Sequence, residues 1–200
     1  LRPFLIRPFP MIRKPIVLLA LLAWRCVAAE NVPNLRDHHV SLLMQLASRE
    51  PSSSYVVIDT QDNRLFLRSH EHETLREANC ATGAGRKFEG TKAKHRWQFA
   101  TPTGRFSILR KERDPIWKKP EWAFVESQET VPIFAEDRRR FQRGVLGEYS
   151  LHFLEGYMIH GTLYERNLGK NITHGCVRLA AEDLAHLYDQ VDLGTSIFIY

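Results

Sequence analysis

The sequence predicts a mainly β domain, a sandwich or an open barrel, with a short helix after the cysteine of the principal motif. Runs rich in β-branched and aromatic residues recur from position 55 onward, and turn-forming residues separate most of them. No regular alternation of strand and helix appears, which argues against a parallel α/β sheet. A chain of 200 residues is long enough for one domain with a substantial core.

Seven strands are expected in chain order. The first two form a hairpin, because the runs 55–58 and 65–67 flank the turn residues Gln61-Asp62-Asn63. The remaining five are expected at 78–82, 104–109, 149–153, 157–160 and 196–200. Together they define a domain over residues 55–200, preceded by a helix or linker over residues 30–54.

Two helices are predicted from apolar residues at helical spacing. The helix near the C-terminus follows the acids Glu182 and Asp183, ends before Gly194, and is expected to brace the bend around Cys176. Its apolar face consists of Leu184, Leu187, Tyr188 and Val191. The helix in the 30–54 segment ends at Pro51 and is interpreted as a packing element or a tether. Its apolar face consists of Val40, Leu43, Met44 and Ala47.

The net charge of +5 comes from residues 1–29. These hold five basic side chains and no acid, so 23 basic and 23 acidic side chains remain, and no case for nucleic-acid binding is left. The basic residues, an apolar run over 16–24 and the small residues Val27-Ala28-Ala29 predict a secretory signal peptide over 1–29, with Met11 as a candidate start. The run is shorter than the about 20 residues of a membrane span, so no stable span is expected after cleavage. A buried core helix is the alternative.

Export would place the chain in an oxidising compartment, where paired cysteines form disulfides. Beyond the leader the sequence holds only Cys80 and Cys176. A disulfide between them would block Cys176. Cys80 follows a strand-like run and is therefore predicted to be a small buried hydrophobe. A thiol kept free in an exported protein indicates catalysis.

The strongest functional signal is the pair His160 and Cys176, sixteen positions apart (176 − 160). They stand in Ile159-His160-Gly161-Thr162 and in Thr173-His174-Gly175-Cys176-Val177-Arg178-Leu179. A thiol becomes a strong nucleophile once an imidazole takes its proton. Gly175 allows a tight bend, on which the N–H groups of Gly175 and Cys176 could form an oxyanion hole. The pattern predicts acyl transfer through a thioester.

The same residues resemble a known family. His-Gly-Thr followed by Thr-His-Gly-Cys-Val-Arg is similar to the signature of the L,D-transpeptidase (YkuD-type) catalytic domain. Thr101-Pro102-Thr103-Gly104-Arg105-Phe106 is similar to the family's Thr-Pro-x-Gly-x-Phe strand, and Arg143-Gly144-Val145-Leu146-Gly147 to its approach to the histidine. These landmarks, in the family's order, cover roughly residues 55–200.

The resemblance implies an exported enzyme of peptidoglycan in the periplasm or cell envelope, without a cofactor and sensitive to carbapenems. Cys176, deprotonated by His160, would attack the carbonyl between meso-diaminopimelate and the terminal D-alanine of a tetrapeptide stem. A second stem as acceptor would give a cross-link and a lipoprotein would give an anchored protein. Water would give L,D-carboxypeptidase activity, which is the principal alternative.

The resemblance also implies supporting roles. The Gly161 carbonyl would orient His160. From its place in the motif, two residues before Cys176, His174 could hold the bend by a side-chain hydrogen bond, contact substrate or act as the general base. Arg178 would bind a substrate carboxylate or pair with an acid to fix its loop. Thr162 and Thr173 are expected to shape the pocket edge by hydrogen bonds, with Thr173 also counted among the substrate-binding residues.

Residues 111–144 form a long stretch that the sequence predicts to be irregular. It holds Trp117, Trp122 and Phe124 among prolines and charges. Long loops are often lids, and the resemblance places this insertion beside the substrate cleft, which makes Trp117 and Trp122 candidate substrate contacts. The alternative, that the aromatic residues close a satellite core, stays open.

Three other function classes fit the sequence less well than acyl transfer. His152, His160, His174 and Cys176 are candidate zinc ligands, but the paired short spacings of structural zinc sites are missing, so no metal is expected. A non-catalytic wall-binding module would have no need of His160, Gly175, Cys176 and Arg178. A cysteine peptidase acting on proteins would leave the family resemblance unexplained.

Overall fold

The computed structural model describes residues 39–42, 44, 53–92 and 94–200. The chain separates into two compact units, residues 1–50 and 51–200. In the first unit, residues 39–42 and 44 are helical, and the side chains of Val40 and Met44 are exposed. The predicted signal peptide and the other two apolar positions of that helix, Leu43 and Ala47, lie outside the described residues. In the part of the chain that the structure describes, no helix is long and apolar enough to cross a membrane.

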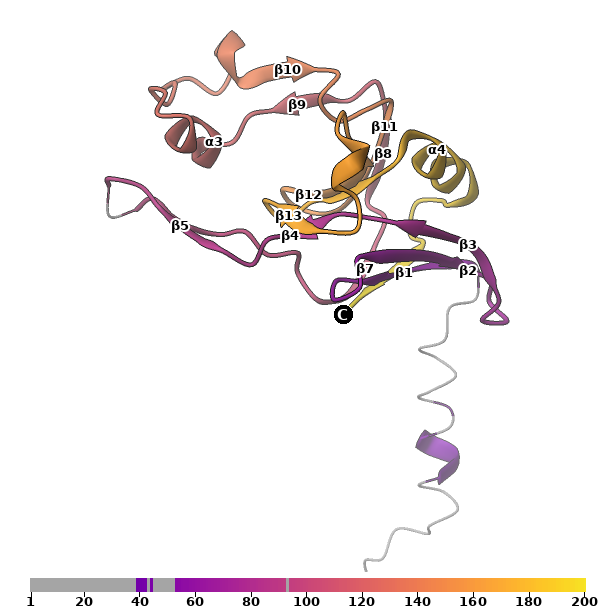
Figure 1. The fold of residues 1–200 in the computed structure, drawn as a ribbon. Helices are drawn as coiled ribbons and strands as arrows, with labels where there is room; N and C mark the ends of the chain where they lie inside the picture. The colour runs from indigo at the N-terminus through magenta and orange to yellow at the C-terminus, as the bar shows by residue number, and fades with distance from the viewer. Residues whose placement is uncertain (1–38, 43, 45–52, 93) are drawn as a thin grey trace, which may run out of the picture. The chain divides into compact units, whose positions relative to one another are not determined.

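The second unit is mainly β, as predicted, and its first sheet has five strands in the order β3-β2-β1-β15-β7 (Figure 1). The predicted hairpin is present as β1 and β2. Strand β15 pairs in parallel with β1, and the other neighbours are antiparallel. The strands are β1 (Tyr55–Asp59), β2 (Arg64–Arg68), β3 (Thr74–Asn79), β7 (Gly104–Ser107) and β15 (Ser196–Ile199).

The second sheet has four strands in the order β14-β12-β11-β8. They are β8 (Arg110–Arg113), β11 (Tyr149–Leu154), β12 (Tyr157–Gly161) and β14 (Val177–Leu179). Side chains alternate between two faces along each strand. One face is mostly apolar and packs into the core, and its buried residues include Leu151, Phe153, Ile159, Val177 and Leu179. The opposite face therefore holds the residues at the positions between these.

One hydrophobic core contains residues of both sheets and of α4 (Ala181–Gln190), the helix predicted after Cys176. Two charged contacts fasten this helix. Arg76 of β3 bonds to Asp183 in its first turn at 2.7 Å, and Lys111 Nζ donates to the carbonyls of Tyr188 and Val191 at its end, both at 2.6 Å. An acid at the start and a cation at the end both suit the helix dipole.

Two predicted strands end early because the chain crosses from one sheet to the other. The strand expected at 78–82 divides into β3 and β4 (Thr82–Gly83), since Ala81 exchanges backbone hydrogen bonds with Arg178 of the second sheet. The strand expected at 104–109 ends at Ser107, and the Leu109 N–H donates to the carbonyl of His152 on β11.

The prediction that residues 111–144 are irregular was wrong. They include the end of β8, a two-stranded sheet of β9 (Ile116–Lys118) and β10 (Phe141–Arg143), the helix α3 (Glu121–Glu126) and a short 3-10 helix, η1 (Arg138–Arg140). These elements are too short and too polar to show a period in the sequence. A second unpredicted hairpin joins β5 (Lys87–Glu89) and β6 (Arg96–Gln98). The stretch from β9 to β10, residues 116–143, is called the α3 segment below. The hairpin and the α3 segment both extend away from α4 (Figure 1).

Candidate active site

The floor of the candidate site is the polar face of the four-stranded sheet. Strand pairing sets Glu112 of β8 opposite Ser150 of β11, Ser150 opposite His160 of β12, and His160 opposite Arg178 of β14. Residues paired across neighbouring strands lie about 5 Å apart and point to the same face. This cross-strand row thus runs from an acid at one edge of the sheet to a cation at the other.

A cavity of about 800 Å³ opens above this floor. The β5–β6 hairpin lines one wall through Arg96, Trp97, Gln98 and Phe99, and the α3 segment lines another through Trp117, Lys118 and Trp122. Seven of the nine predicted site residues line this single cavity. They are Cys176, His160, His174, Arg178, Thr173, Trp117 and Trp122.

His160 is buried, and its ring is oriented by the backbone. Its Nδ1 lies 2.7 Å from the carbonyl oxygen of Gly161, which can only accept, so Nδ1 carries the proton and the neutral ring keeps its lone pair on Nε2. Burial, together with the nearby Arg178 cation, lowers the pKa of His160 to about 4. The imidazole is therefore neutral at pH 7, in the tautomer that a general base needs.

Gly161 itself is required by close packing. Its N–H donates to the Leu146 carbonyl at 2.7 Å, and a Cβ added to it would lie 3.1 Å from the Cα of Gly147. The two glycines therefore allow the segment before β11 to lie directly against the end of β12. That contact explains why both belong to the motifs noted in the sequence.

Cys176 lies immediately before β14 and is partly exposed to the cavity. Its thiol donates to the Gly156 carbonyl at 3.7 Å, and no hydrogen bond joins it to His160 in this conformation. Burial raises the pKa of Cys176, and a hydrogen bond from the Met158 backbone and the charge of Arg178 act in the opposite direction. At pH 7 the cavity is thus lined by a neutral thiol and a neutral imidazole.

Cys80 is a free thiol in the core, as predicted, with none of its surface exposed. Burial raises its pKa to about 12. Such a thiol is inert. Cys176 is also free, so the two cysteines form no disulfide.

The bend before Cys176 is held by two threonine hydroxyls. Thr173 Oγ1 donates to the Cys176 carbonyl at 2.6 Å and accepts from the Gly175 N–H at 3.1 Å. Thr101 Oγ1 donates to the Gly175 carbonyl at 2.9 Å and accepts from the Gly83 N–H at 2.8 Å. Because Thr173 takes the Gly175 N–H, that group is not free to serve as the expected oxyanion donor here. Thr101 is the first residue of the Thr-Pro-x-Gly-x-Phe motif, but the sequence did not indicate that its hydroxyl supports the bend.

Gly175 has a φ of +124°, a conformation that side chains rarely adopt. A Cβ at this position would also lie 2.7 Å from the Tyr157 ring and 3.0 Å from the Ala100 carbonyl oxygen. Both the bend and its surroundings therefore require glycine.

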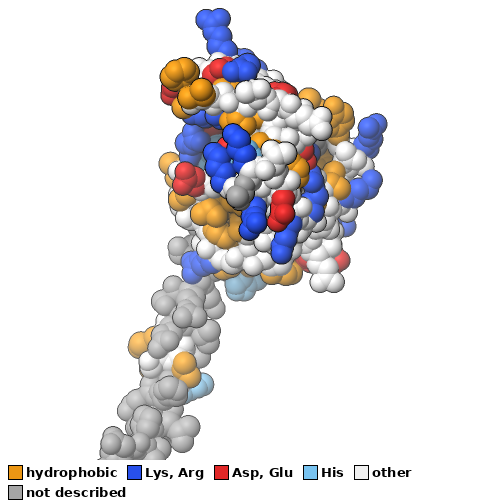
Figure 2. Space-filling view, turned by 90° about the vertical axis from the view of Figure 1, so that its left-hand side faces the viewer, with side chains coloured by type: hydrophobic (Ala, Val, Ile, Leu, Met, Phe, Trp, Pro, Cys, Tyr) orange, Lys and Arg blue, Asp and Glu red, His pale blue; other side chains and the backbone are white. Residues whose placement is uncertain are grey.

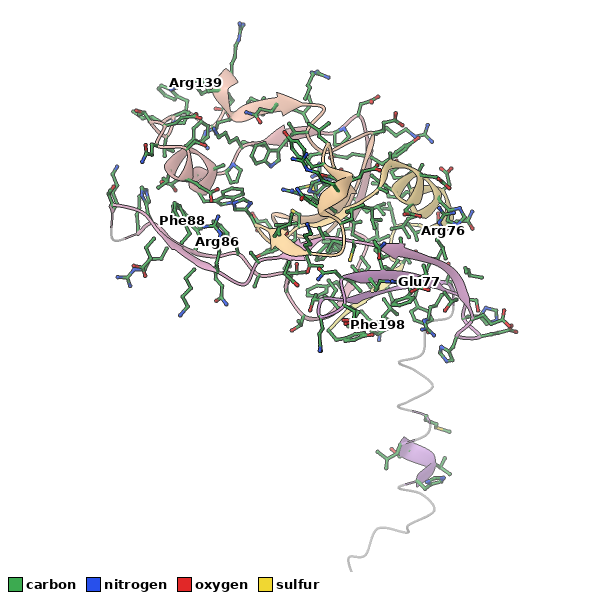
Figure 3. The ribbon with its side chains drawn as sticks, viewed as in Figure 1. Arg76, Glu77, Arg86, Phe88, Arg139 and Phe198 are labelled. Carbon is green, nitrogen blue, oxygen red and sulfur yellow. The ribbon has the colours of Figure 1, made fainter. Side chains whose placement is uncertain are left out.

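His174 connects the bend to α3. Its Nε2 bonds to Glu126 at 2.7 Å, and Glu126 is also paired with Arg86 of the hairpin segment. Arg86 lies over the ring of Phe99, 4.9 Å from its centre, and near Phe88 (Figure 3). His174 thus connects the bend to α3 and also lines the cavity, so its predicted roles stay predictions.

Residues 111–144 contain both cavity-lining and fully buried aromatic side chains, so the lid role stays a prediction beside the satellite core. Trp117 and Trp122 line the cavity, whereas Phe124 is fully buried beneath α3. The Lys119 ammonium lies 4.3 Å from the centre of the Phe124 ring and bonds to Glu129 at 2.9 Å. A small satellite core therefore fixes the segment whose tryptophans border the cavity.

A mainly β domain whose His–Gly and His–Gly–Cys segments meet in one cavity defines a class of protein, and comparison identifies it. Residues 53–199 match the family model of the L,D-transpeptidase catalytic domain (YkuD). The chain belongs to this family.

Curated relatives match over shorter stretches. The chain is 28% identical over 99 residues to the putative L,D-transpeptidase YqjB of Bacillus subtilis (strain 168), covering 50% of this chain and 51% of that protein. It is 27% identical over 96 residues to the probable L,D-transpeptidase ErfK/SrfK of Escherichia coli (strain K12), covering 46% of this chain and 30% of the relative. The chain thus covers about half or less of these relatives' lengths.

Solved structures share the fold. An L,D-transpeptidase from Xylanimonas cellulosilytica aligns with a TM-score of 0.53 at 20% identity, covering 76% of this chain and 62% of that chain. The catalytic domain of the Enterococcus faecium L,D-transpeptidase aligns with a TM-score of 0.51 at 17% identity, covering 75% of this chain and 98% of that chain.

Proposed function

We propose that this protein is an exported L,D-transpeptidase that acts on peptidoglycan stem peptides in the periplasm. The observation that carries the proposal is the orientation of His160, whose Nδ1 is held by the Gly161 carbonyl while its ring shares a cavity with Cys176. This arrangement supplies a base and a nucleophile without a carboxylate partner.

In the first half-reaction, His160 Nε2 takes the proton of Cys176, and Sγ attacks the carbonyl between meso-diaminopimelate and D-alanine. The developing oxyanion accepts from the Cys176 N–H, a contact worth about 3 kcal/mol in comparable sites. The C–N bond breaks, His160 returns its proton to the leaving amine, and a thioester remains. Arg178 lies on the edge strand β14, two residues after Cys176, and would hold a carboxylate of the donor stem.

In the second half-reaction, an amine attacks the thioester carbonyl, the C–S bond breaks and the thiol regains a proton. An amine from another stem gives a cross-link, and one from a lipoprotein gives an anchored protein. Attack by water gives L,D-carboxypeptidase activity, which is the second candidate function. Both reactions share every step up to the thioester, so the same residues support both.

The thioester step also supports sensitivity to carbapenems. One structural neighbour, the LD transpeptidase LdtMt1, was solved in complex with the carbapenem imipenem. It aligns with a TM-score of 0.51 at 18% identity. We expect a carbapenem to add its mass to Cys176 of this protein.

Mass spectrometry of muropeptides tests the proposal. The protein and its Cys176→Ala variant are incubated with purified disaccharide-tetrapeptide. Cross-linked dimers from the unmodified protein alone would support transpeptidation by Cys176, and tripeptide without dimers would favour the carboxypeptidase. No turnover and no carbapenem adduct would refute an enzymatic role and leave the wall-binding alternative.

A further inference from the structure

A second polar cluster lies on the same floor, on strands β8 and β11. His152 Nε2 is 3.0 Å from Glu112 Oε2, and the hydroxyl of Ser150 is 3.4 Å from the same oxygen. His152, Glu112 and Arg110 all line the cavity that contains Cys176. The proposed mechanism uses none of these groups.

The hydrogen bonds fix the tautomer of His152. The Glu112 carboxylate can only accept, so the proton of the neutral ring is on Nε2 and the lone pair is on Nδ1. Arg110 Nη2 lies 3.2 Å from Nδ1 and 3.3 Å from Nε2, which places this guanidinium nitrogen over the ring and not in its plane. The in-plane direction of Nδ1 is thus left for a hydrogen-bond donor.

The charges around the cavity make this cluster distinctive. Four cations line it, Arg96, Arg110, Lys118 and Arg178, and among the described lining residues Glu112 is the only acid. The face that carries the end of the hairpin and α3 is rich in Lys and Arg side chains (Figure 2). Walls with this positive charge favour the binding of carboxylates. They disfavour the binding of a cationic ligand everywhere except beside Glu112.

An amine acceptor brings a positive charge into this cavity, since primary amines are protonated at pH 7. We infer that the Glu112–His152 pair is the acceptor subsite, in which His152 Nδ1 accepts a hydrogen bond from the acceptor ammonium and Glu112 balances its charge. The bound ammonium then loses one proton to water, and the neutral amine attacks the thioester. This inference rests on the proposed function and assigns a position to its second substrate.

The row geometry places donor and acceptor on opposite sides of the proposed base. Arg178 and Glu112 occupy the two ends of one cross-strand row, with His160 and Ser150 between them. A donor carboxylate at Arg178 and an acceptor ammonium near Glu112 would approach Cys176 from opposite edges of the sheet. Arg110 already pairs with Glu112 through its Nη1, and because the Arg110 side chain is 59% exposed this ion pair is weak, so Arg110 can turn into water when the ammonium takes its place.

The test measures how the thioester divides between amine and water. The full chain is incubated with disaccharide-tetrapeptide as donor and excess stem tripeptide, which carries a free diaminopimelate amine, as acceptor. The ratio of cross-linked to hydrolysed product depends only on the acyl-enzyme, so a loss of folded protein or slower acylation does not change it. The variants are Glu112→Gln and His152→Phe, and the matched control is Glu148→Gln, an exposed acid beside β11 that does not line the cavity.

We expect the ratio to fall about fivefold in both variants, as for a partly exposed charged contact, and to stay unchanged in the control. N-acetylated tripeptide should not enter a cross-linked product with any of these proteins, because its amine is blocked. An unchanged ratio in Glu112→Gln and His152→Phe would overturn the acceptor subsite while leaving transpeptidation intact. Hydrolysis alone by the unmodified protein, at any acceptor concentration, would also overturn it. No product of either kind would overturn the proposed function itself.

Discussion

The ring of His174 stacks on the indole of Trp122, with ring centroids 4.1 Å apart and an angle of 13° between the planes. His174 belongs to the bend before Cys176 and Trp122 to α3, so one side chain fixes the distance between the proposed nucleophile's loop and the wall of the cavity. Glu126, the hydrogen-bond partner of His174, adds a second attachment on the same helix.

Removing the ring should therefore release α3. We expect His174→Ala to lower the free energy of unfolding by about 2–3 kcal/mol, and His174→Phe, which keeps the stacking, by about 1 kcal/mol. Urea denaturation followed by tryptophan fluorescence measures both. Equal losses in the two variants would show that stacking on Trp122 contributes nothing.

His160 should make stability depend on pH. Its pKa in the folded protein is about 4, below the ordinary value of 6.5, so between these values the unfolded chain binds more protons. Stability therefore rises with pH through this window and is lost as the pH falls from 6.5 to 4, by up to about 3 kcal/mol. Urea denaturation at pH 7 and pH 4.5 should show a smaller difference for His160→Gln than for the unmodified protein. Equal differences would contradict the buried neutral imidazole.

The two thiols should differ in reactivity. At pH 7.5, iodoacetamide should modify Cys176 slowly and Cys80 only after unfolding, because Cys80 is fully buried and its pKa is raised to about 12. Peptide mass mapping locates the label, with Cys176→Ala as the control. The rate at Cys176 should keep rising as the pH passes 9, since burial raises the pKa of this thiol as well. A rate already constant from pH 5 upward would indicate a preformed thiolate–imidazolium pair.

Gly175 should tolerate no side chain. Gly175→Ala combines an unfavourable φ with a clash against the Tyr157 ring, and we expect it to cost more than about 3 kcal/mol of stability. Gly144→Ala is the matched control, because Gly144 has a φ of +76° and nothing within 4 Å of the added Cβ, so only the backbone cost of about 1 kcal/mol remains. Thermal denaturation compares the two, and similar losses would refute the clash.

Thr101 should be needed for its hydroxyl. Thr101→Val keeps the shape but leaves the Gly83 N–H and the Gly175 carbonyl without their partner, at a cost of about 2–4 kcal/mol. Thr101→Ser keeps both hydrogen bonds and should cost less. Carbapenem acylation should slow in Thr101→Val, since the bend before Cys176 loses a support. Equal acylation rates in the two variants would show that the hydroxyl does not position the bend.

Much of this architecture was predictable because it depends on periodic apolar sequence. The long strands β1, β11 and β12 and the helix α4 each bury one face, and burial leaves a period of 2 or 3.6 in the sequence. That His160 and Cys176 line one cavity was predictable for a different reason, since glycines beside each residue mark places where the backbone must pack closely.

The elements that surround the cavity escaped prediction because they are short and polar. Strand β8 has the sequence Arg110-Lys111-Glu112-Arg113, in which Lys111 fills its inward position by capping α4 and not by apolar burial. The contact of His174 with Glu126 joins residues 48 positions apart, a separation on which no local pattern bears. The charged residues of these short elements therefore did not indicate which of them would face the core and which would face the cavity.

The position of β15 constrains the order in which the domain can fold. Residues 196–199 form an inner strand, flanked by β1 on one side and β7 on the other (Figure 1). Until these residues have been synthesised, β1 lacks its parallel neighbour and the first sheet remains in two pieces. Contacts between the first and last strands of a domain are costly in chain entropy and slow to form. Nascent chains therefore cannot complete the first sheet until synthesis has passed residue 199.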